Sequence, residues 1–256
     1  MRSAVSPRVD TDIMGWDKTR ADALRKELSD LYESKLQEEW RTPGRATPEW
    51  YDHHIDLHLW QEYGNGFWAE RGAFAAQAMR HGDTVLDLAC GDGFYEAAFY
   101  RNIATSITAI DLDPLAIAHA CEYNSAPNVR FVVADLHDWL AEAQRRGADH
   151  RYDVVIMNAA IDHFDKDEID ETLPNVARLL RNGGIFVGCT IKGRRGQYEH
   201  SGRGHEFGAL EELGVELKQH FPHVYLHSTN YGKGRVNYYW QASNEPTRRA
   251  GIFQPA

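Results

Sequence analysis

From Thr84 onward, short apolar runs alternate with longer segments in which apolar and polar positions repeat at helical spacing. The apolar runs predict strands at 84–89, 106–110, 129–134, 152–157, 185–191, 224–229 and 236–242. The segments between them predict helices at 94–102, 114–123, 137–146, 166–180 and 206–220. This alternation is typical of the α/β class, here a doubly wound, mostly parallel seven-stranded sheet with helices on both faces. The last two strands follow each other closely, which predicts an antiparallel edge strand.

The part of the chain before Thr84 has a different pattern, with a polar tail and several candidate helices. Helices are predicted at 17–40, 50–60 and 67–80, with a Pro-rich break before the second. We therefore expect an N-terminal tail and helical lid over 1–66, a main α/β domain over 67–243 and a C-terminal tail over 244–256.

Composition narrows the class of protein. The chain has 256 residues, 43% of them hydrophobic, which suits one large domain with an extension. A net charge of −10 makes a nucleic-acid partner improbable. The three cysteines have no paired spacing, and no apolar run approaches membrane-spanning length. These features predict a cytoplasmic protein without a membrane partner, and they leave the oligomeric state open.

The chemistry centres on residues 85–95, Val-Leu-Asp-Leu-Ala-Cys-Gly-Asp-Gly-Phe-Tyr. The stretch predicts a buried strand, a glycine loop and the start of a helix, which is the ligand-binding corner of a doubly wound sheet. A dinucleotide fingerprint needs a third glycine where Glu96 stands. Asp87 lies inside the strand, where aspartate is disfavoured, so its carboxylate is expected to have a partner.

The Asp87–Gly93 stretch, D-x-x-x-G-x-G, resembles the first motif of the class I S-adenosylmethionine-dependent methyltransferases, in their small-molecule branch. The resemblance implies a Rossmann-like methyltransferase fold and S-adenosylmethionine as cofactor. It also implies that Asp87 orders the loop and helps to hold the methionyl ammonium. The loop backbone at Ala89, Cys90, Gly91 and Gly93 would lie against the cofactor.

Later strand ends carry further residues that match this family. An acid about twenty residues after a glycine loop suits the ribose hydroxyls, which the resemblance assigns to Asp111, with Leu112 against the adenine. The alternative is that Asp111 or Asp113 caps the helix beginning at Pro114, Asp113 being the better candidate.

The third and fourth predicted strands end in similar positions. The resemblance gives Asp135 the adenine amino group and Leu136 the adenine ring, while the alternative is a helix cap at Asp135. Asn158 and Ala159 would line the methionyl end of the cofactor.

His163, a few residues beyond the fourth strand, is the candidate general base. Its ordinary pKa suits deprotonation of a hydroxyl or ammonium near neutral pH, although a lone histidine is more often structural. Asp162 would orient it, or else cap the following helix.

Candidate acceptor contacts come from two variable regions. The glycine-rich loop 192–207 carries Arg194, Arg195 and His200, which suit an anionic acceptor group or else a solvated surface. The aromatic segment 50–60 contributes Tyr51 and His54. A metal site at His53, His54 and His58 is disfavoured, because the H-E-x-x-H glutamate is missing.

The motifs span residues 84–191 and include a turn before the fifth strand in which Asn182 replaces the family's usual proline. The implied activity is in-line methyl transfer to a hydroxyl or amine of a small molecule, such as a sugar-like or natural-product metabolite. The alternatives are a non-catalytic module with the same fold and an NAD-dependent oxidoreductase. The latter is disfavoured by Glu96 and by the lack of a Tyr-x-x-x-Lys run.

Overall fold

A computed structural model describes residues 66–146, 151–193, 204–231 and 235–246, together with positions 23, 26, 27 and 30. The described chain forms a seven-stranded sheet in the order β3-β2-β1-β4-β5-β7-β6. The strands are β1 (Thr84–Leu88), β2 (Ser106–Asp111), β3 (Val129–Val133), β4 (Tyr152–Asn158), β5 (Leu180–Ile191), β6 (His223–Asn230) and β7 (Val236–Ser243). This confirms the predicted α/β class and doubly wound, mostly parallel sheet.

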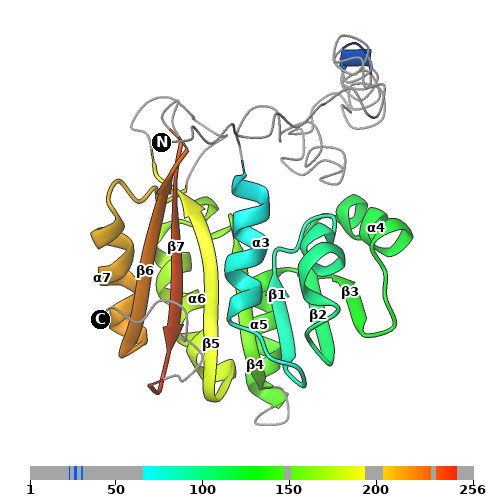
Figure 1. Cartoon of the computed structure of the whole chain (residues 1–256). Coiled ribbons are helices and arrows are strands. Elements are labelled where there is room, and N and C mark those ends of the chain that lie inside the picture. The colour runs from blue at the N-terminus through cyan, green and yellow to red at the C-terminus, as the bar shows by residue number, and fades with distance from the viewer. Residues whose placement is uncertain are drawn as a thin grey trace, which may run out of the picture. The chain divides into compact units, whose positions relative to one another are not determined.

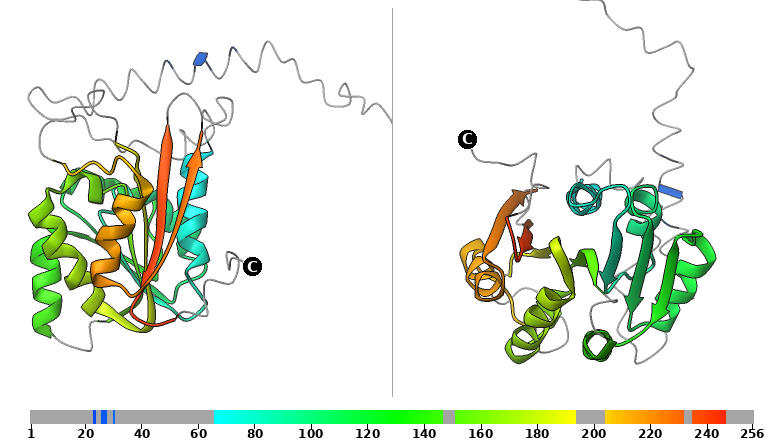
Figure 2. Two further views of the ribbon diagram at one scale, coloured as in Figure 1. Left: turned by 90° about the vertical axis from the view of Figure 1, so that its left-hand side faces the viewer. Right: turned by 90° about the horizontal axis from the view of Figure 1, so that it is seen from below.

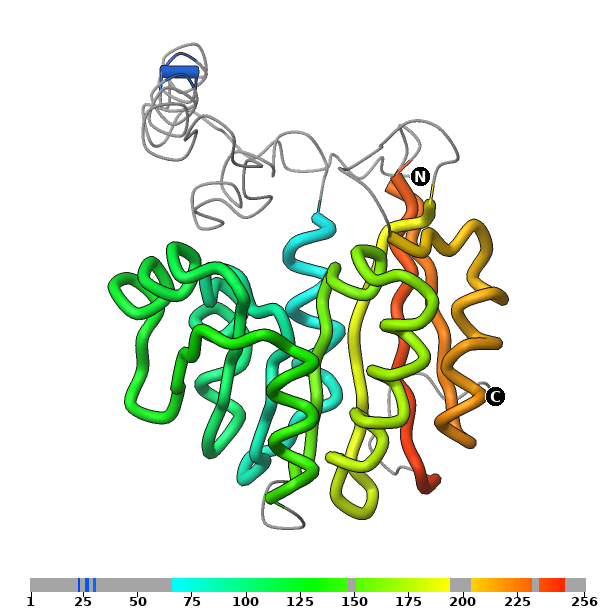
Figure 3. The backbone as a smooth tube through the Cα atoms, turned by 180° about the vertical axis from the view of Figure 1, so that it is seen from behind, coloured from blue at the N-terminus to red at the C-terminus, as the bar shows by residue number. Residues whose placement is uncertain are grey.

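Helices cover both faces of the sheet. They are α3 (Phe67–Gln77), the π-helix η3 (Glu96–Tyr100), α4 (Pro114–Tyr123), α5 (Leu136–Arg146), the 3₁₀-helix η5 (Ile161–His163), α6 (Lys166–Leu179) and α7 (Leu210–His220). Figure 1 shows α3 in front of the strands, and Figure 3, from behind, shows α5 and α6 in front of them. At the far edge, α7 packs on β6 (Figure 2).

The central strand β4 explains why the core has two halves. Its residues 154–157 are all fully buried. Val154 and Ile156 join the core under α3 and η3, whereas Val155 and Met157 join the core under α5, α6 and α7. Because successive side chains of a strand point to opposite faces, one continuous apolar run fills both halves.

The antiparallel strand predicted at the end of the chain is present, but it lies one place in from the edge. β7 pairs antiparallel with β5 on one side and with β6 on the other, so β6 forms the edge. The chain turns after β6 and places β7 between β5 and β6. The spacing of the two apolar runs could not show which of the two strands forms the edge.

Besides shifts of one to three residues at several ends, three predicted elements differ from the structure. The turn predicted at 182–184 lies within β5, where Gly183 has φ +69° and the register with β4 shifts. The helix predicted at 94–102 becomes π-helical, with the Arg101 N–H donating to the Glu96 carbonyl at 2.9 Å. The last helix begins at Leu210 rather than 206, because the Glu212 carboxylate accepts from the Gly208 N–H at 2.7 Å.

By its contacts, the chain divides into two compact units, 1–51 and 52–256. In the first unit, the four described positions are helical, and Lys26 pairs with Asp30 at 2.6 Å. The rest of the predicted helix 17–40, the helix 50–60 and most of the predicted C-terminal tail lie outside the described residues. The boundaries 1–66, 67–243 and 244–256 stay predictions. Among the described helices, none has the length and apolar character needed to cross a membrane.

Candidate functional site

The carboxyl ends of the parallel strands meet along one rim of the sheet, where open α/β sheets bind their ligands. Three backbone hydrogen bonds join neighbouring strand ends. The Cys90 N–H donates to the Ile110 carbonyl at 2.9 Å, and the Ala134 N–H donates to Asp111 at 2.9 Å. On the other side, the Ala159 N–H donates to the Cys189 carbonyl at 2.8 Å. The predicted cofactor residues after β1, β2, β3 and β4 are thus brought together on one edge.

Asp111 fastens the glycine loop to the second strand. Its Oδ2 accepts from the Gly91 N–H at 2.8 Å, and its Oδ1 accepts from the Asp113 N–H at 2.9 Å. Burial raises the pKa of Asp111 above its ordinary value, against the lowering effect of these amide donors. Each oxygen keeps a lone pair, so the carboxylate can accept ligand hydroxyls while holding the loop.

The loop backbone is unusual at two alanines. Ala89, just after β1, has φ +65°, and Ala159, just after the neighbouring β4, has φ +52°. Such left-handed angles are rare in residues with a side chain, and they cluster at functional sites. Gly93 has φ +72°, and a Cβ there would lie 2.5 Å from Cζ of Phe131. The loop is therefore tightly fixed between β1 and β3.

Asp87 and Glu96 form a buried carboxyl pair beneath this loop. Asp87 is 2% exposed and Glu96 is fully buried. The two groups lie within hydrogen-bonding reach, a contact that needs a proton on one of them. Burial, and then the charge of Glu96, raises the pKa of Asp87 well above its ordinary value. Burial raises the pKa of Glu96 to about 7.

In the sequence Glu96 was noted as the residue that replaces the third glycine of a dinucleotide fingerprint, and its pairing with Asp87 was missed. The signal was present in the run Phe-Tyr-Glu-Ala-Ala-Phe-Tyr, where a single acid stands among apolar and aromatic residues. A charged residue in such a run is buried only with a partner.

Two of the predicted acids cap helices. Asp113 accepts from the Leu115 N–H at 2.8 Å, so it caps α4 as predicted. Asp135 accepts from the His137 N–H at 2.9 Å and from the Asp138 N–H at 3.1 Å, both through Oδ1. The capping alternative therefore holds for Asp135. Only its second carboxylate oxygen, Oδ2, is left to accept a hydrogen bond from an adenine amino group.

The residues assigned to the adenine ring differ in exposure. Leu112 is 67% exposed at the rim, an apolar side chain without cover from the described chain. Leu136 is 9% exposed and belongs to the core. Leu112 is thus better placed to gain contact area from a flat ligand.

The end of β4 leads into the candidate catalytic residues. The Asn158 amide donates to the Tyr100 hydroxyl at 3.1 Å, which links this end to η3. Asp162 and His163 lie on η5, with the His163 side chain exposed. The capping role considered for Asp162 was wrong, because Asp165 caps α6 in a capping box. The Oδ1 atom of Asp162 is buried without a hydrogen-bond partner in the described chain.

The late loop returns to this end of β4. The His205 N–H donates to the Phe164 carbonyl at 2.6 Å, and a Cβ at Gly204 would lie 2.0 Å from the Asp162 carbonyl oxygen. Residues 204–205 therefore close over η5. Of the residues predicted to contact the acceptor, His163 lies on η5 and the others lie outside the described residues: Tyr51, His54, Arg194, Arg195 and His200. The histidines of the disfavoured metal site, His53, His54 and His58, also lie outside them.

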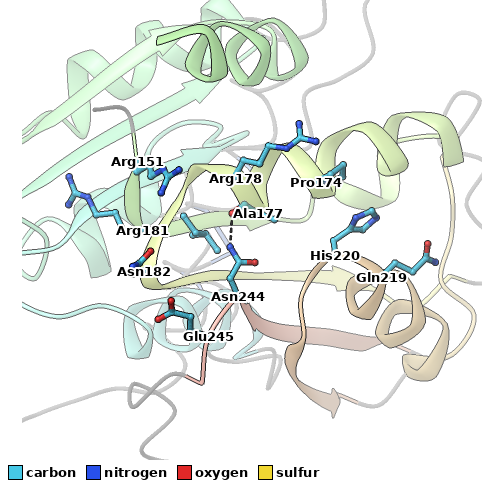
Figure 4. A pocket seen from close by; sticks show the side chains of 11 residues that line it. Arg151, Pro174, Ala177, Arg178, Arg181, Asn182, Gln219, His220, Asn244 and Glu245 are labelled. Carbon is cyan, nitrogen blue, oxygen red and sulfur yellow. Dashed lines mark hydrogen bonds between the residues drawn. The ribbon is translucent and has the colours of Figure 1, made fainter. Parts of the chain in front are cut away.

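A cavity of about 440 Å³ lies at the opposite end of the sheet (Figure 4). Its lining includes Arg151, Arg178 and Arg181, and the Asn244 amide donates to the Ala177 carbonyl at 2.8 Å beside it. Arg151 precedes β4 and Arg181 lies at the start of β5, so this cavity faces the amino ends of the strands. It is separate from the rim that carries the glycine loop.

Comparisons with known proteins agree with this geometry. The model of a family described as "Methyltransferase domain" matches residues 85–184. A probable phthiotriol/phenolphthiotriol dimycocerosates methyltransferase of Mycobacterium ulcerans (strain Agy99) is 31% identical over 119 residues, 46% of this chain and 43% of that relative. An uncharacterised methyltransferase of Mycobacterium tuberculosis (strain ATCC 25618 / H37Rv) is 29% identical over 185 residues, 62% of this chain and 86% of the relative.

A ribosomal protein L11 methyltransferase of Enterococcus faecalis (strain ATCC 700802 / V583) is 32% identical over 109 residues, 43% of this chain and 32% of the relative. Among solved structures, the complex of DhpI with SAH has a TM-score of 0.55 at 19% identity, covering 88% of this chain and 99% of that one. The chain thus spans less than half of the first relative, most of the second and nearly all of the solved fold. The matched stretch runs from the strand before the glycine loop into the fifth strand, so residues 85–184 match the methyltransferase domain family, and the fold of the described chain is similar to that of a solved structure in complex with SAH.

Proposed function

We propose that this chain transfers the methyl group of S-adenosylmethionine to a hydroxyl or amine of a small-molecule acceptor by in-line displacement. The observation that carries the proposal is the glycine loop held by Asp111 above the buried pair of Asp87 and Glu96. The fit to the cofactor is chemical. A carboxylate at a strand end suits ribose hydroxyls, and the buried carboxyl pair suits a cation.

Each predicted cofactor residue except Leu136, which belongs to the core, has a proposed role. Asp111 accepts from the ribose hydroxyls while it continues to hold the Gly91 N–H. Leu112 covers the adenine, which would bury much of its exposed side chain. Asp135 accepts from the adenine amino group through the oxygen that does not cap α5.

The methionyl end belongs to residues nearer the middle of the sheet. Asp87, with Ala89, Cys90, Gly91 and Gly93 of the loop backbone, surrounds the ammonium side, and Asn158 and Ala159 line the neighbouring side. The left-handed backbone at Ala89 and Ala159 supports this role, because such angles in residues with a side chain cluster at functional sites.

When bound, the cofactor supplies an electrophilic methyl group on a sulfonium. The chain's own contribution is to hold the acceptor atom in line with that group and to exclude water, and positioning accounts for most of the rate. His163 accepts the proton when the acceptor must lose one, and Asp162 orients its ring. The exposed His163 side chain beside residues 204–205 supports this assignment.

A small acceptor is supported by the net charge of −10, which disfavours nucleic acid. The printed name of one relative, a phthiotriol/phenolphthiotriol dimycocerosates methyltransferase, also indicates a non-protein acceptor for that enzyme. A protein acceptor is the second candidate, because another relative is named for ribosomal protein L11. A non-catalytic binding module would keep the cofactor affinity and lose turnover.

The test begins with isothermal titration of the full chain with S-adenosylmethionine and with NAD. Preference for NAD would reject the proposal. Labelled methyl transfer is then measured into a metabolite extract and into a protein extract. Label in a small product supports the proposal, label only in protein favours the second candidate, and cofactor binding without any transfer favours the binding module.

A further inference from the structure

Two arginines lie close together beside the carboxyl ends of β4 and β5. Arg71, on α3, is 3% exposed, and Arg235 directly precedes β7. Both guanidinium groups contact Phe67, with Cζ to ring-centre distances of 5.5 Å for Arg71 and 3.9 Å for Arg235. Burial, and then the charge of Arg71, lowers the pKa of Arg235 to about 10. Both groups therefore remain charged at neutral pH.

This pair of like charges lacks a balancing anion in the described chain. Nε and Nη2 of Arg71 and Nε of Arg235 are buried without a hydrogen-bond partner. Neither guanidinium forms an ion pair with a carboxylate of the residues that the structure describes. Stacking of Arg71 on Trp68, at 5.0 Å, offsets part of the cost of burial, but aromatic faces do not satisfy N–H donors.

The carboxylate next to Arg71 in sequence is already engaged. Glu70 accepts from the Tyr239 hydroxyl at 3.1 Å and from the Thr229 hydroxyl at 2.7 Å. Burying a charge is costly unless it is paired and hydrogen-bonded. A site with one buried and one half-buried guanidinium and three unused donor atoms is therefore complementary to an oxyanion, which guanidinium groups bind through paired hydrogen bonds.

The position of the pair relates it to the transferred methyl group. The Arg71 guanidinium lies within electrostatic range of Tyr95, two residues after Gly93 of the glycine loop. Cys189, whose carbonyl accepts from Ala159, lies within electrostatic range of both arginines. The pair thus borders the proposed methionyl end on the side away from Asp111.

We infer that Arg71 and Arg235 bind an oxyanion of the acceptor, a carboxylate or phosphate group, and so hold the acceptor beside the methyl donor. The inference rests on the proposed methyl transfer and narrows its acceptors to anionic small molecules. Two rival sources of the anion are the carboxylate of the cofactor itself and a carboxylate from residues outside the described ranges.

The test uses the full chain saturated with S-adenosylhomocysteine, at constant ionic strength. Inorganic phosphate and succinate are the probes, and their binding is measured by isothermal titration. We expect the wild type to bind at least one probe saturably. The Arg235→Gln variant should weaken that Kd by roughly tenfold or more, since hydrogen bonds to charged groups are among the stronger ones.

Arg130→Gln is the matched control. Arg130 also lies over an aromatic ring, that of Trp139 at 5.7 Å, but it is exposed on β3 far along the sheet. It should leave probe binding unchanged. Equal probe binding in wild type and Arg235→Gln would overturn the inference. So would a wild type that binds neither probe, the result expected if a carboxylate of the chain already fills the site.

A second arm separates the cofactor's carboxylate from that of the acceptor. The Kd values of S-adenosylhomocysteine and of 5′-methylthioadenosine, which lacks the amino-acid part, are measured for wild type, Arg71→Gln and Arg235→Gln. Weakened binding of the first ligand alone, with no probe bound by the wild type, would assign the arginines to the cofactor and overturn the inference. Retained affinity for S-adenosylhomocysteine in Arg235→Gln shows that the variant is folded. A wild type that does not bind S-adenosylhomocysteine at all would instead reject the proposed function.

Discussion

The two sides of the candidate site carry opposite charge. Around the glycine loop, Asp87, Glu96 and Asp111 lie within electrostatic range of one another. Beside β5 and β7, Arg71 and Arg235 lie together without a carboxylate of the described chain. The acidic side suits a cationic methyl donor, and the basic side suits an anionic acceptor. The same edge of the sheet can therefore place the two ligands on different sides according to their charge.

The two sides also differ in how they are encoded. Asp87 and Gly93 belong to one strand-loop-helix unit, so a local motif predicted Asp87, the glycine loop and their fold. The basic side joins residue 71 to residue 235, through the insertion of β7 between β5 and β6. No short pattern connects these positions, and the arginines were therefore not predicted.

The largest expected effect concerns His163, on η5 beyond the carboxyl end of β4. His163→Ala should slow turnover by roughly 10²–10⁴-fold if the residue accepts the acceptor's proton. The affinity for S-adenosylhomocysteine should be kept, because the change removes no proposed cofactor contact. Steady-state rates and titration of the same preparation check both points. If His163→Ala turns over at the wild-type rate, then His163 is not the general base, and positioning of the acceptor by the basic side suffices for transfer.

The next largest effect is expected from a change in the glycine loop of the acidic side. Gly93→Ala forces a left-handed angle on a residue with a side chain and places its Cβ 2.5 Å from Phe131. We expect a loss of unfolding free energy of about 2–4 kcal/mol, from strain and overpacking together. Urea unfolding measures it.

Gly183→Ala is the matched control for that measurement. Gly183 has nearly the same angle, φ +69°, but nothing lies within 4 Å of its added Cβ. It should cost only about 1 kcal/mol, the part due to conformation. Equal losses at both glycines would mean that Phe131 yields and that the loop is less tightly fixed than the distances indicate.

The buried carboxyl pair predicts a pH dependence of stability. Glu96 has an ordinary pKa of 4.5 and a folded pKa of about 7. Between these values the folded state keeps a proton that the unfolded state loses, so the contribution of this group to stability is fully present below pH 4.5 and is lost as pH rises towards 7. Glu96→Gln removes this titration.

From pH 5 to pH 8, wild type should lose about 2–4 kcal/mol more unfolding free energy than Glu96→Gln does. Urea unfolding at both pH values gives the difference. Glu122→Gln, on the exposed surface of α4, is the control and should follow the wild type. If the unfolding free energies of wild type and Glu96→Gln change equally between the two pH values, then Asp87 and Glu96 do not share a proton.

Individual residues show which features of the candidate site can be predicted from the sequence. Asp113 was recognised as a cap because Pro114 follows it, a signal contained in two positions. Asp135 has no such neighbour, and its cap was considered only as the alternative to an adenine contact. The π-helix at Glu96–Tyr100 was also missed, because its apolar spacing resembles that of an α-helix over so short a length. Glu96 begins this π-helix and is buried against Asp87 of β1, so its burial depends on how η3 packs against that strand.

The smallest expected effect separates ligand binding from local structure within the acidic side. Asp111→Ala should weaken S-adenosylhomocysteine binding by about 1–3 kcal/mol, because ribose hydroxyls and the Gly91 N–H lose their acceptor. Asp113→Ala is the control, two residues away, and removes only the cap of α4. It should lower stability by about 1 kcal/mol and leave the Kd unchanged. Titration with S-adenosylhomocysteine and with methionine alone completes the comparison, since methionine has no ribose and its weak binding should not distinguish the Asp111 variant from wild type. If Asp111→Ala and Asp113→Ala weaken S-adenosylhomocysteine equally, then the carboxylate at 111 orders the rim without touching the nucleoside.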